Sequence, residues 1–203
     1  MRDTVFVFAR APRLGGVKRR LAREIGERAA LRFYLATLHA VVRRLARDRR
    51  FTTVLAVTPN GGHIPGLPGV ARVGQGGGDL GARMARVLAR HRHGRAAVVG
   101  SDIPAVTAAD IRACFRALGQ ADACFGRAAD GGYWLVGFGP RRVAHPFAAV
   151  RWSTAHALAD TLANQNGRRV TMLRTLRDVD GARVGELREH QSSSSGSTAA
   201  TRG

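Results

Sequence analysis

Residues 4–22 read TVFVFARAPRLGGVKRRLA, a short apolar run followed at once by a basic loop. The run at 4–9 is apolar and rich in β-branched and aromatic residues, which predicts a buried strand. After it come one proline, two glycines and several basic residues, and then a helix-like pattern begins. A strand, a glycine-containing loop and a helix in this order indicate an α/β fold with an anion-binding position at the start of the helix.

Length and composition limit the class of protein. With 203 residues and a hydrophobic fraction of 45%, the chain can form one domain with a sizeable core. No apolar stretch reaches the roughly 18 residues of a membrane span, and the start, Met-Arg-Asp, lacks the apolar segment of a signal peptide. Cys114 and Cys124 lie in apolar surroundings and are predicted to be buried free thiols. We therefore expect a cytoplasmic protein.

The net charge of +19 invites the idea of a nucleic-acid partner. The basic residues are spread along the chain, aromatic residues are only 6%, and no known nucleic-acid motif is present. We therefore expect no specific nucleic-acid partner. Nearly every basic residue is arginine, which indicates a compositional bias, and Lys18 is the only lysine. Its position in the glycine loop suggests that it has a function there.

The rest of the chain alternates between strand and helix patterns. Strands are predicted at 52–58, 70–73, 96–100, 121–126, 132–138 and 170–174, and helices at 27–47, from Asp79 to about Arg90, at 107–118 and at 154–165. This alternation predicts a single Rossmann-like α/β domain of three layers with a mainly parallel sheet. The close pair 121–126 and 132–138 adds antiparallel pairing, so the sheet should be mixed. We expect this domain to cover 1–190 and the polar, low-complexity segment 191–203 to be disordered.

Ligands of open α/β sheets bind beyond the carboxyl ends of the strands. At these positions the chain has the basic loop, a glycine-rich segment at 74–84, and isolated carboxylates. Gly15 and Gly16 would let the backbone approach a ligand, and Lys18, Arg19 and Arg20 would neutralise phosphate charge. The loop is not a Walker A motif. The pattern predicts a phosphorylated ligand together with a divalent cation.

Asp102, in the segment GSDIP (100–104), is the strongest candidate ligand for that cation. Mg²⁺ takes oxygen ligands, often one or two carboxylates plus substrate phosphates. Asp102 could instead cap the next turn. Asp178 and Asp180 form a second acidic pair, for which an exposed acidic turn is the alternative.

Three further motifs are less specific. GGGDLG (76–81) matches a dinucleotide fingerprint, but it does not lie in the first βα unit, so we expect a turn before a helix capped by Asp79 and no nicotinamide or flavin cofactor. DGGYW (130–134) is either a hairpin turn or a carboxylate with aromatic rings that contact a sugar or base. His91 and His93 are expected to be exposed at a helix end.

Together these stretches resemble a bacterial family of glycosyltransferase-A-like proteins with the nucleotide-diphospho-sugar transferase fold, some of whose members are assigned to arsenosugar biosynthesis. The resemblance extends from residue 3 to about 184. The matching segments, in order, are ARAPRLGGVKRRL, GQGGGDLGARM, GSDIP, RAADGGYW, VRWSTAHAL and LRDVD. The chain departs from the family pattern at Arg10, where the family has lysine, and at Arg19, where it has threonine. An acid before Asp130 and a carboxylate after Asp180 are also missing.

The resemblance implies a role for each matching residue. Asp102 and Asp130 would be catalytic, and Asp102 with Asp180 would hold Mg²⁺ or Mn²⁺. The residues implied in nucleotide or phosphate binding are Arg10, Gly15, Gly16, Lys18, Arg20 and Arg83. Those implied in an acceptor or sugar pocket are Gly131, Gly132, Tyr133 and Trp152.

The resemblance therefore implies a metal-dependent glycosyltransferase that takes a nucleotide sugar and a small-molecule acceptor. A nucleotidyltransferase, which joins an NTP to a phosphorylated small molecule and releases pyrophosphate, uses a similar basic loop and similar aspartates. A third alternative is a degenerate module that only binds nucleotides. The sequence does not identify the base, the sugar or the acceptor.

Overall fold

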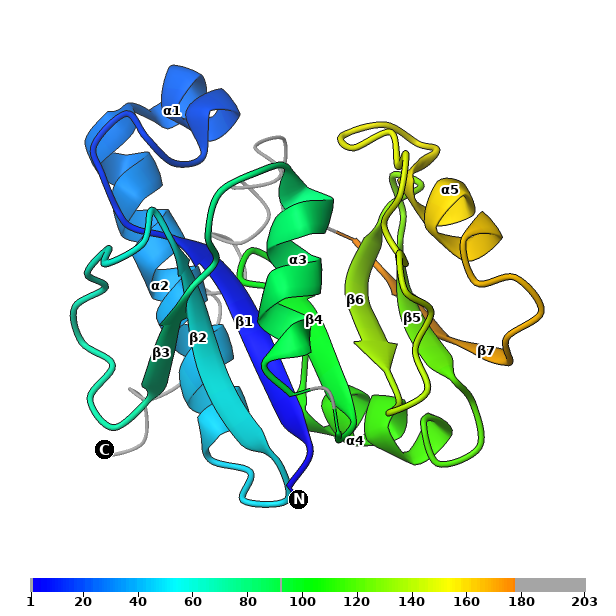
Figure 1. Cartoon of the computed structure of the whole chain (residues 1–203). Coiled ribbons are helices and arrows are strands. Elements are labelled where there is room, and N and C mark those ends of the chain that lie inside the picture. Colours follow the sequence, from blue (N-terminus) through cyan, green and yellow to red (C-terminus); the bar gives the residue numbers. More distant parts are fainter. Residues whose placement is uncertain (1, 92, 178–203) are drawn as a thin grey trace, which may run out of the picture.

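The structure is a computed structural model and describes residues 2–91 and 93–177. Its centre is a seven-stranded sheet with the order β3-β2-β1-β4-β6-β5-β7 (Figure 1). Strand β6 runs antiparallel to its neighbours β4 and β5, and the other pairs are parallel. The predicted mixed, mainly parallel sheet is therefore confirmed. The strands are β1 (Thr4–Arg10), β2 (Thr52–Thr58), β3 (Ala71–Gly74), β4 (Ala96–Gly100), β5 (Ala123–Ala128), β6 (Tyr133–Phe138) and β7 (Val170–Leu176).

Helices cover both faces of the sheet, as the three-layer prediction requires. They are α1 (Arg19–Ile25), α2 (Glu27–Ala46), α3 (Leu80–Ala89), α4 (Ala108–Ala117) and α5 (Ala157–Ala163). Side chains alternate between the two faces of β1. Val7 belongs to an apolar cluster with Leu38 of α2 and Ile111 of α4. Phe6 belongs to a second cluster with Met84 of α3. Figure 1 shows α3 and α2 on opposite sides of the sheet.

Local signals in the sequence place most elements correctly. Asp79 caps α3 by accepting a hydrogen bond from Ala82 N at 2.7 Å. Thr107 and Asp110 form the predicted capping box at the start of α4. Both cysteines are buried free thiols, as predicted.

The differences occur at the ends of elements. The sequence pattern did not distinguish the separate helix α1. Gly26 lies between α1 and α2, and its φ of +82°, which suits glycine, interrupts the helical backbone there. Strand β5 starts at Ala123, two residues later than predicted. Helix α5 starts at Ala157, because the Thr154 hydroxyl donates to Arg151 O and accepts from His156 N, which holds this segment in a turn.

His91 and His93 follow helix α3. His93 is exposed, as expected, but the prediction is wrong for His91, which is partly buried. The His91 Nε2 atom is buried without a hydrogen-bond partner, and burial holds the pKa of the ring below its usual value. His91 is therefore a packed residue in this fold.

Two predictions concern residues outside the described ranges. Asp178 and Asp180 lie there, and so do the end of the expected 1–190 domain and the expected disordered tail at 191–203. Among the residues that the structure does describe, no helix has the length and apolar character needed to cross a membrane.

The Asp110 carboxyl links α4 to β7 and should make the stability of the fold depend on pH. Burial acts to raise the pKa of Asp110, but hydrogen bonds from Arg174 and Thr107 outweigh it and hold the pKa below its usual value. A carboxyl with a lowered folded-state pKa stabilises the fold above its unfolded value, about 3.9. That stabilisation is lost as the pH falls through the folded-state pKa.

We therefore expect Asp110→Asn to lower the free energy of unfolding by about 1–2 kcal/mol at pH 7 and by much less at pH 3. Urea denaturation at both pH values measures this. Asp79→Asn is the control, because asparagine caps a helix as well as aspartate. An equal loss at both pH values would show that the charge of Asp110 is not what matters.

Candidate functional site

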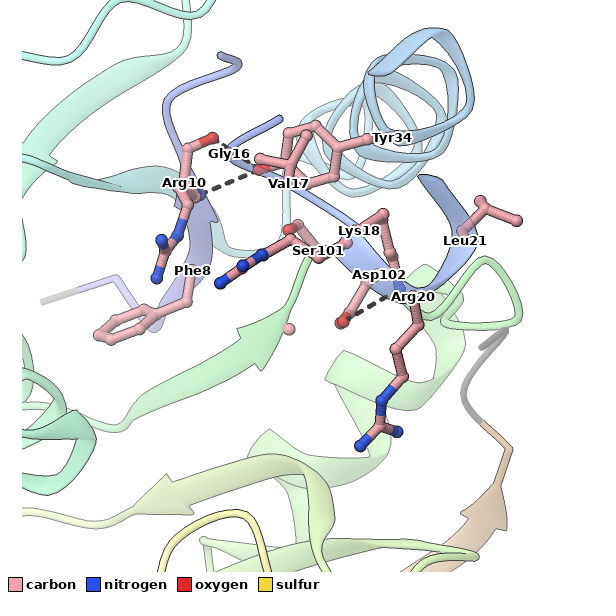
Figure 2. Close-up of a pocket in the computed structure, with 12 residues that line it drawn as sticks. Phe8, Arg10, Gly16, Val17, Lys18, Arg20, Leu21, Tyr34, Ser101 and Asp102 are labelled. Atoms are coloured by element: carbon pink, nitrogen blue, oxygen red, sulfur yellow. Dashed lines mark hydrogen bonds and ion pairs between the residues drawn. The ribbon is translucent and has the colours of Figure 1, made fainter. Parts of the chain in front are cut away.

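A cavity of about 580 Å³ opens where β1 and β4 end. Figure 2 shows its walls: the ends of the two strands, the loop after β1, the start of α1, and one side chain of α2. The pocket therefore lies at the carboxyl edge of the sheet, where the sequence predicts it. Its lining residues are Phe8, Arg10, Gly16, Val17, Lys18, Arg19, Arg20, Leu21, Tyr34, Gly100, Ser101 and Asp102.

Lys18 and Asp102 meet inside this pocket. Lys18 Nζ lies 3.5 Å from Asp102 Oδ2, and the two side chains are 11% and 41% exposed. Lys18 is the N-cap residue of α1, with a φ of +45°, a left-handed conformation that costs free energy for any residue except glycine. The structure thus brings together the predicted phosphate-binding lysine and the predicted cation ligand.

Tyr34 of α2 lines the pocket, and the sequence reasoning missed it. Its hydroxyl donates to Arg10 O at 2.7 Å and accepts from Arg10 N at 2.9 Å. Burial raises the pKa of the Tyr34 phenol, although hydrogen bonds to the Arg10 backbone and to Ser101 act to lower it. The phenol therefore stays protonated and fixes the end of β1. Its spacing of four residues from Leu38, on the buried face of α2, was the available signal.

The loop that carries Asp102 is held from both sides. Arg44 of α2 donates to Pro104 O at 2.6 Å and to Val106 O at 2.7 Å. Arg174 of β7 donates to Ala105 O at 3.2 Å and also pairs with Asp110. These contacts fix the segment that follows β4, so Asp102 leaves the sheet in a defined direction. The sequence contained no signal for either arginine.

Gln75 joins the glycine-rich segment to the sheet. It is 2% exposed, and its Nε2 donates to Ala9 O and Ala56 O. Its Oε1 accepts from Arg83 Nη1 at 3.2 Å, and Arg83 Nε donates to Asp79 O. Arg83 is therefore held at the same edge of the sheet, but it does not line the pocket.

Gly15 and Gly16 shape the loop between β1 and α1. Gly15 has a φ of +69°, and a Cβ there would lie 2.9 Å from Glu27 Oε1. Gly16 N donates to Arg13 O at 3.0 Å in a turn. Gly16 lines the pocket and Gly15 does not. Both glycines are consistent with a tight loop that exposes backbone to a ligand.

The predicted acceptor group lies apart from the pocket. Asp130 is exposed in the turn between β5 and β6, where its Oδ1 accepts from Gly132 N at 3.0 Å. Gly131 has a φ of +87°, and a Cβ there would collide with the backbone of Ala155. This turn stands at the same edge of the sheet, because β5 is parallel to β1 and β4, but its residues do not line the cavity.

Tyr133 and Trp152 belong to an aromatic cluster. Their ring centroids are 6.4 Å apart, Tyr133 also packs against Phe125 and Trp152 against Phe147, and burial raises the pKa of Tyr133. Trp152 Nε1 is buried without a hydrogen-bond partner. Both rings are partly buried and pack against the apolar cluster on this face of the sheet, and neither lines the pocket.

The donor set indicates what kind of cation the pocket suits. Among the described residues, no group of three or more His, Cys, Asp or Glu side chains is placed to hold a metal ion, and Asp102 is the only one of these four residue types in the pocket lining. Mg²⁺ and Mn²⁺ can be held by a single carboxylate when substrate phosphates and water supply the other ligands. The residues therefore fit a cation that binds together with a phosphorylated ligand.

The fold is that of the nucleotide-diphospho-sugar transferases. A proposed transferase of this type from Desulfovibrio desulfuricans G20 is 27% identical, with a TM-score of 0.82 over 89% of this chain and 83% of that one. A nucleotidyl transferase from Methanothermobacter is 15% identical, with a TM-score of 0.63 over 95% and 99% of the two chains. A Mycobacterium tuberculosis glucosyl-3-phosphoglycerate synthase, in complex with Mn²⁺ and UDP, is 10% identical, with a TM-score of 0.55 over 87% and 70%.

The chain belongs to the DUF2064 family, described as uncharacterized protein conserved in bacteria, whose model matches residues 37–154. This range includes Asp102 and the turn at 130–134, and it begins after the loop that carries Lys18. A comparison with curated proteins found no match.

The Tyr34 hydroxyl should matter for the stability of the pocket wall. We expect Tyr34→Phe to lower the free energy of unfolding by about 1–2 kcal/mol, because it leaves the Arg10 N–H and C=O without their partner. Tyr133→Phe is the matched control, since its hydroxyl has only a 3.5 Å contact with Thr161. Urea denaturation compares the two variants. Equal losses would mean that the bonds to Arg10 contribute no more than a weak contact.

Proposed function

We propose that this protein is a metal-dependent transferase that moves a glycosyl group from a nucleotide sugar to a small-molecule acceptor. The observation that supports the proposal is the meeting of Lys18, Arg10 and Arg20 with Asp102 in one pocket at the carboxyl edge of the sheet. Ammonium and guanidinium groups bind phosphate oxygens. A carboxylate among them has a use if a divalent cation bridges it to the same phosphates.

In this proposal the nucleotide diphosphate lies along the loop after β1. Lys18, Arg10 and Arg20 neutralise its charge, and the backbone at Gly15 and Gly16 lets it approach closely. Arg83 is held near the same edge by Gln75 and can bind an extended part of the donor.

Asp102 would hold the divalent cation, Mg²⁺ or Mn²⁺, together with phosphate oxygens of the donor, and we propose Asp180 as a further ligand. When bound, the cation offsets the negative charge that develops on the leaving diphosphate. The basic side chains of the pocket act on the same charge, so the residues that bind the ground state also stabilise the transition state.

We assign Asp130 to the acceptor side of the reaction, as an orienting group or general base. It follows β5, two strand positions from β4, and therefore lies roughly 10 Å across the sheet from the end of β4. In nucleotidyl transfer the acceptor attacks the α-phosphate and would lie beside Lys18. In glycosyl transfer it attacks the sugar carbon and would lie beyond the diphosphate. The distance of Asp130 from the end of β4 therefore favours glycosyl transfer. Gly131, Gly132, Tyr133 and Trp152 would then shape the acceptor side.

Nucleotidyl transfer is the second candidate. It is supported by the similar fold of the Methanothermobacter nucleotidyl transferase, which matches 95% of this chain. Transfer in arsenosugar biosynthesis is a finer proposal that rests on the family resemblance alone. The products separate the two reaction types, because glycosyl transfer releases a nucleoside diphosphate and nucleotidyl transfer releases pyrophosphate.

Nucleotide binding should depend on both the cation and Asp102. We expect a nucleotide sugar with Mn²⁺, at about one hundred times its Kd, to raise the Tm of the wild type by about 5–10 °C. The shift should fall to near zero without the cation or in Asp102→Asn. Differential scanning fluorimetry across nucleotides and nucleotide sugars measures it. A shift that is independent of the cation and shared by every polyanion would instead indicate a degenerate or merely basic protein.

Asp130 should affect turnover and leave donor binding intact. The donor for this test is the nucleotide sugar that the fluorimetry screen identifies. We expect Asp130→Asn to lower its turnover by about 100-fold or more and to leave the Tm shift caused by this donor unchanged. Asparagine can still accept the hydrogen bond from Gly132 N, so the turn is kept. Asp122→Asn, at the other end of β5, is the control. If Asp130→Asn turns over at the wild-type rate, Asp130 has no role in the chemistry.

A further inference from the structure

We propose that the ion pair of Lys18 with Asp102 is a latch that couples the cation to the nucleotide diphosphate. The cation takes Asp102 from Lys18, and the diphosphate takes Lys18 from Asp102. Each ligand thereby prepares the site for the other. This inference rests on the proposed function, since it concerns the same pocket and the same two ligands.

The geometry of Lys18 supports the latch. Its side chain is only 11% exposed and its Nζ lies 3.5 Å from Asp102 Oδ2, so the ammonium is directed into the pocket, as Figure 2 shows. The backbone of Lys18 has a φ of +45°, although a glycine would adopt this conformation at less cost. Strained residues of this kind are found where the surrounding structure demands a particular side-chain position. In this conformation the Lys18 side chain lies beside Asp102.

The electrostatics make the two ligands depend on one another. A divalent cation at Asp102 would be repelled by the Lys18 ammonium group, whose Nζ lies 3.5 Å from Asp102 Oδ2. A diphosphate at Lys18 is likewise repelled by the Asp102 carboxylate. Each ligand that binds alone must therefore separate the ion pair and bear the full free-energy cost. When both bind, this cost arises only once. Binding is then cooperative, and by linkage the cation strengthens diphosphate binding by the same factor as the diphosphate strengthens cation binding.

The rest of the pocket fits this account. Asp102 is the only described acidic side chain in the lining, against Arg10, Arg19, Arg20 and Lys18. The cation therefore has one carboxylate to hold it and several positive charges to oppose it. Without phosphates, water supplies its remaining oxygen ligands, so the cation binds weakly alone and more tightly when the diphosphate is present.

Mn²⁺ binding to the full-length protein tests the latch directly. Free Mn²⁺ is measured by electron paramagnetic resonance, without nucleotide, in the wild type, Lys18→Met and Lys18→Gly. We expect both variants to bind Mn²⁺ about two- to fivefold more tightly than the wild type, the range that a partly exposed ion pair gives. Lys18→Gly also relieves the backbone strain, so it covers the case in which Lys18→Met folds poorly. Arg13→Met, which removes one exposed charge from the same loop, should bind Mn²⁺ as the wild type does.

UDP binding, measured by calorimetry with and without Mn²⁺, separates the latch from the proposed function. The latch is wrong if both Lys18 variants bind Mn²⁺ no more tightly than the wild type, or no more tightly than Arg13→Met. The proposed function still stands in that case if UDP binding needs both Mn²⁺ and Asp102. If the Lys18 variants gain Mn²⁺ affinity but no nucleotide binds, the ion pair controls the cation and the nucleotide function is wrong. No Mn²⁺ binding in any variant, with or without UDP, overturns both.

Discussion

Strands β1 and β4 pair in parallel from Thr4 with Ala96 to Phe8 with Gly100, and this register decides where the chemistry can occur. Because β1 continues only two residues beyond the end of β4, the loop after β1 and the segment after β4 leave the same edge of the sheet. Lys18 and Asp102, 84 positions apart in the sequence, meet for this reason. A shift of one residue in the pairing would turn every side chain of β1 to the other face, and the two apolar clusters that hold the sheet could not form. The cores that fix the register therefore also fix the pocket.

The high arginine content has a structural explanation in much of this fold. Arg142 is partly buried and donates to the carbonyls of Gly139, Leu88, His91 and Gly94. Arg44 and Arg174 serve the loop that carries Asp102 in the same way, through backbone carbonyls. A guanidinium group has five donors in a rigid plane, so it can satisfy several carbonyls where loops meet the ends of helices. These three arginines therefore have structural roles in the fold.

The sequence was sufficient for most elements, though not for helix α1, and for the edge of the sheet where the pocket lies, because periodicity, caps and glycines are local signals. It also placed Lys18 and Asp102 at one edge, since the strand-end rule depends only on strand order and direction. It could not identify the contacts of Tyr34, Arg44 or Gln75, because their partners are backbone atoms far away in the sequence. Tyr133 and Trp152 show a different limit, because the sequence identified these residues but did not show what their rings contact. An aromatic ring that stacks on a sugar and one that packs on a core have the same sequence signature, and only the positions of Phe125 and Phe147 show that these two rings pack on each other.

The supply of carboxylates in the pocket has a consequence for how the site is assembled. A resident metal centre needs a set of protein ligands that stays together without substrate, and the described residues give Asp102 alone, already paired with a lysine. In the proposed function the donor's phosphates complete the coordination, so the protein alone holds the cation weakly and binds it more tightly together with the donor. The rigid parts of the site are the end of β1, fixed by Tyr34, and the loop after β4, fixed by Arg44 and Arg174. The pair of Lys18 with Asp102 lies between these two supports, so the proposed latch requires movement of side chains alone.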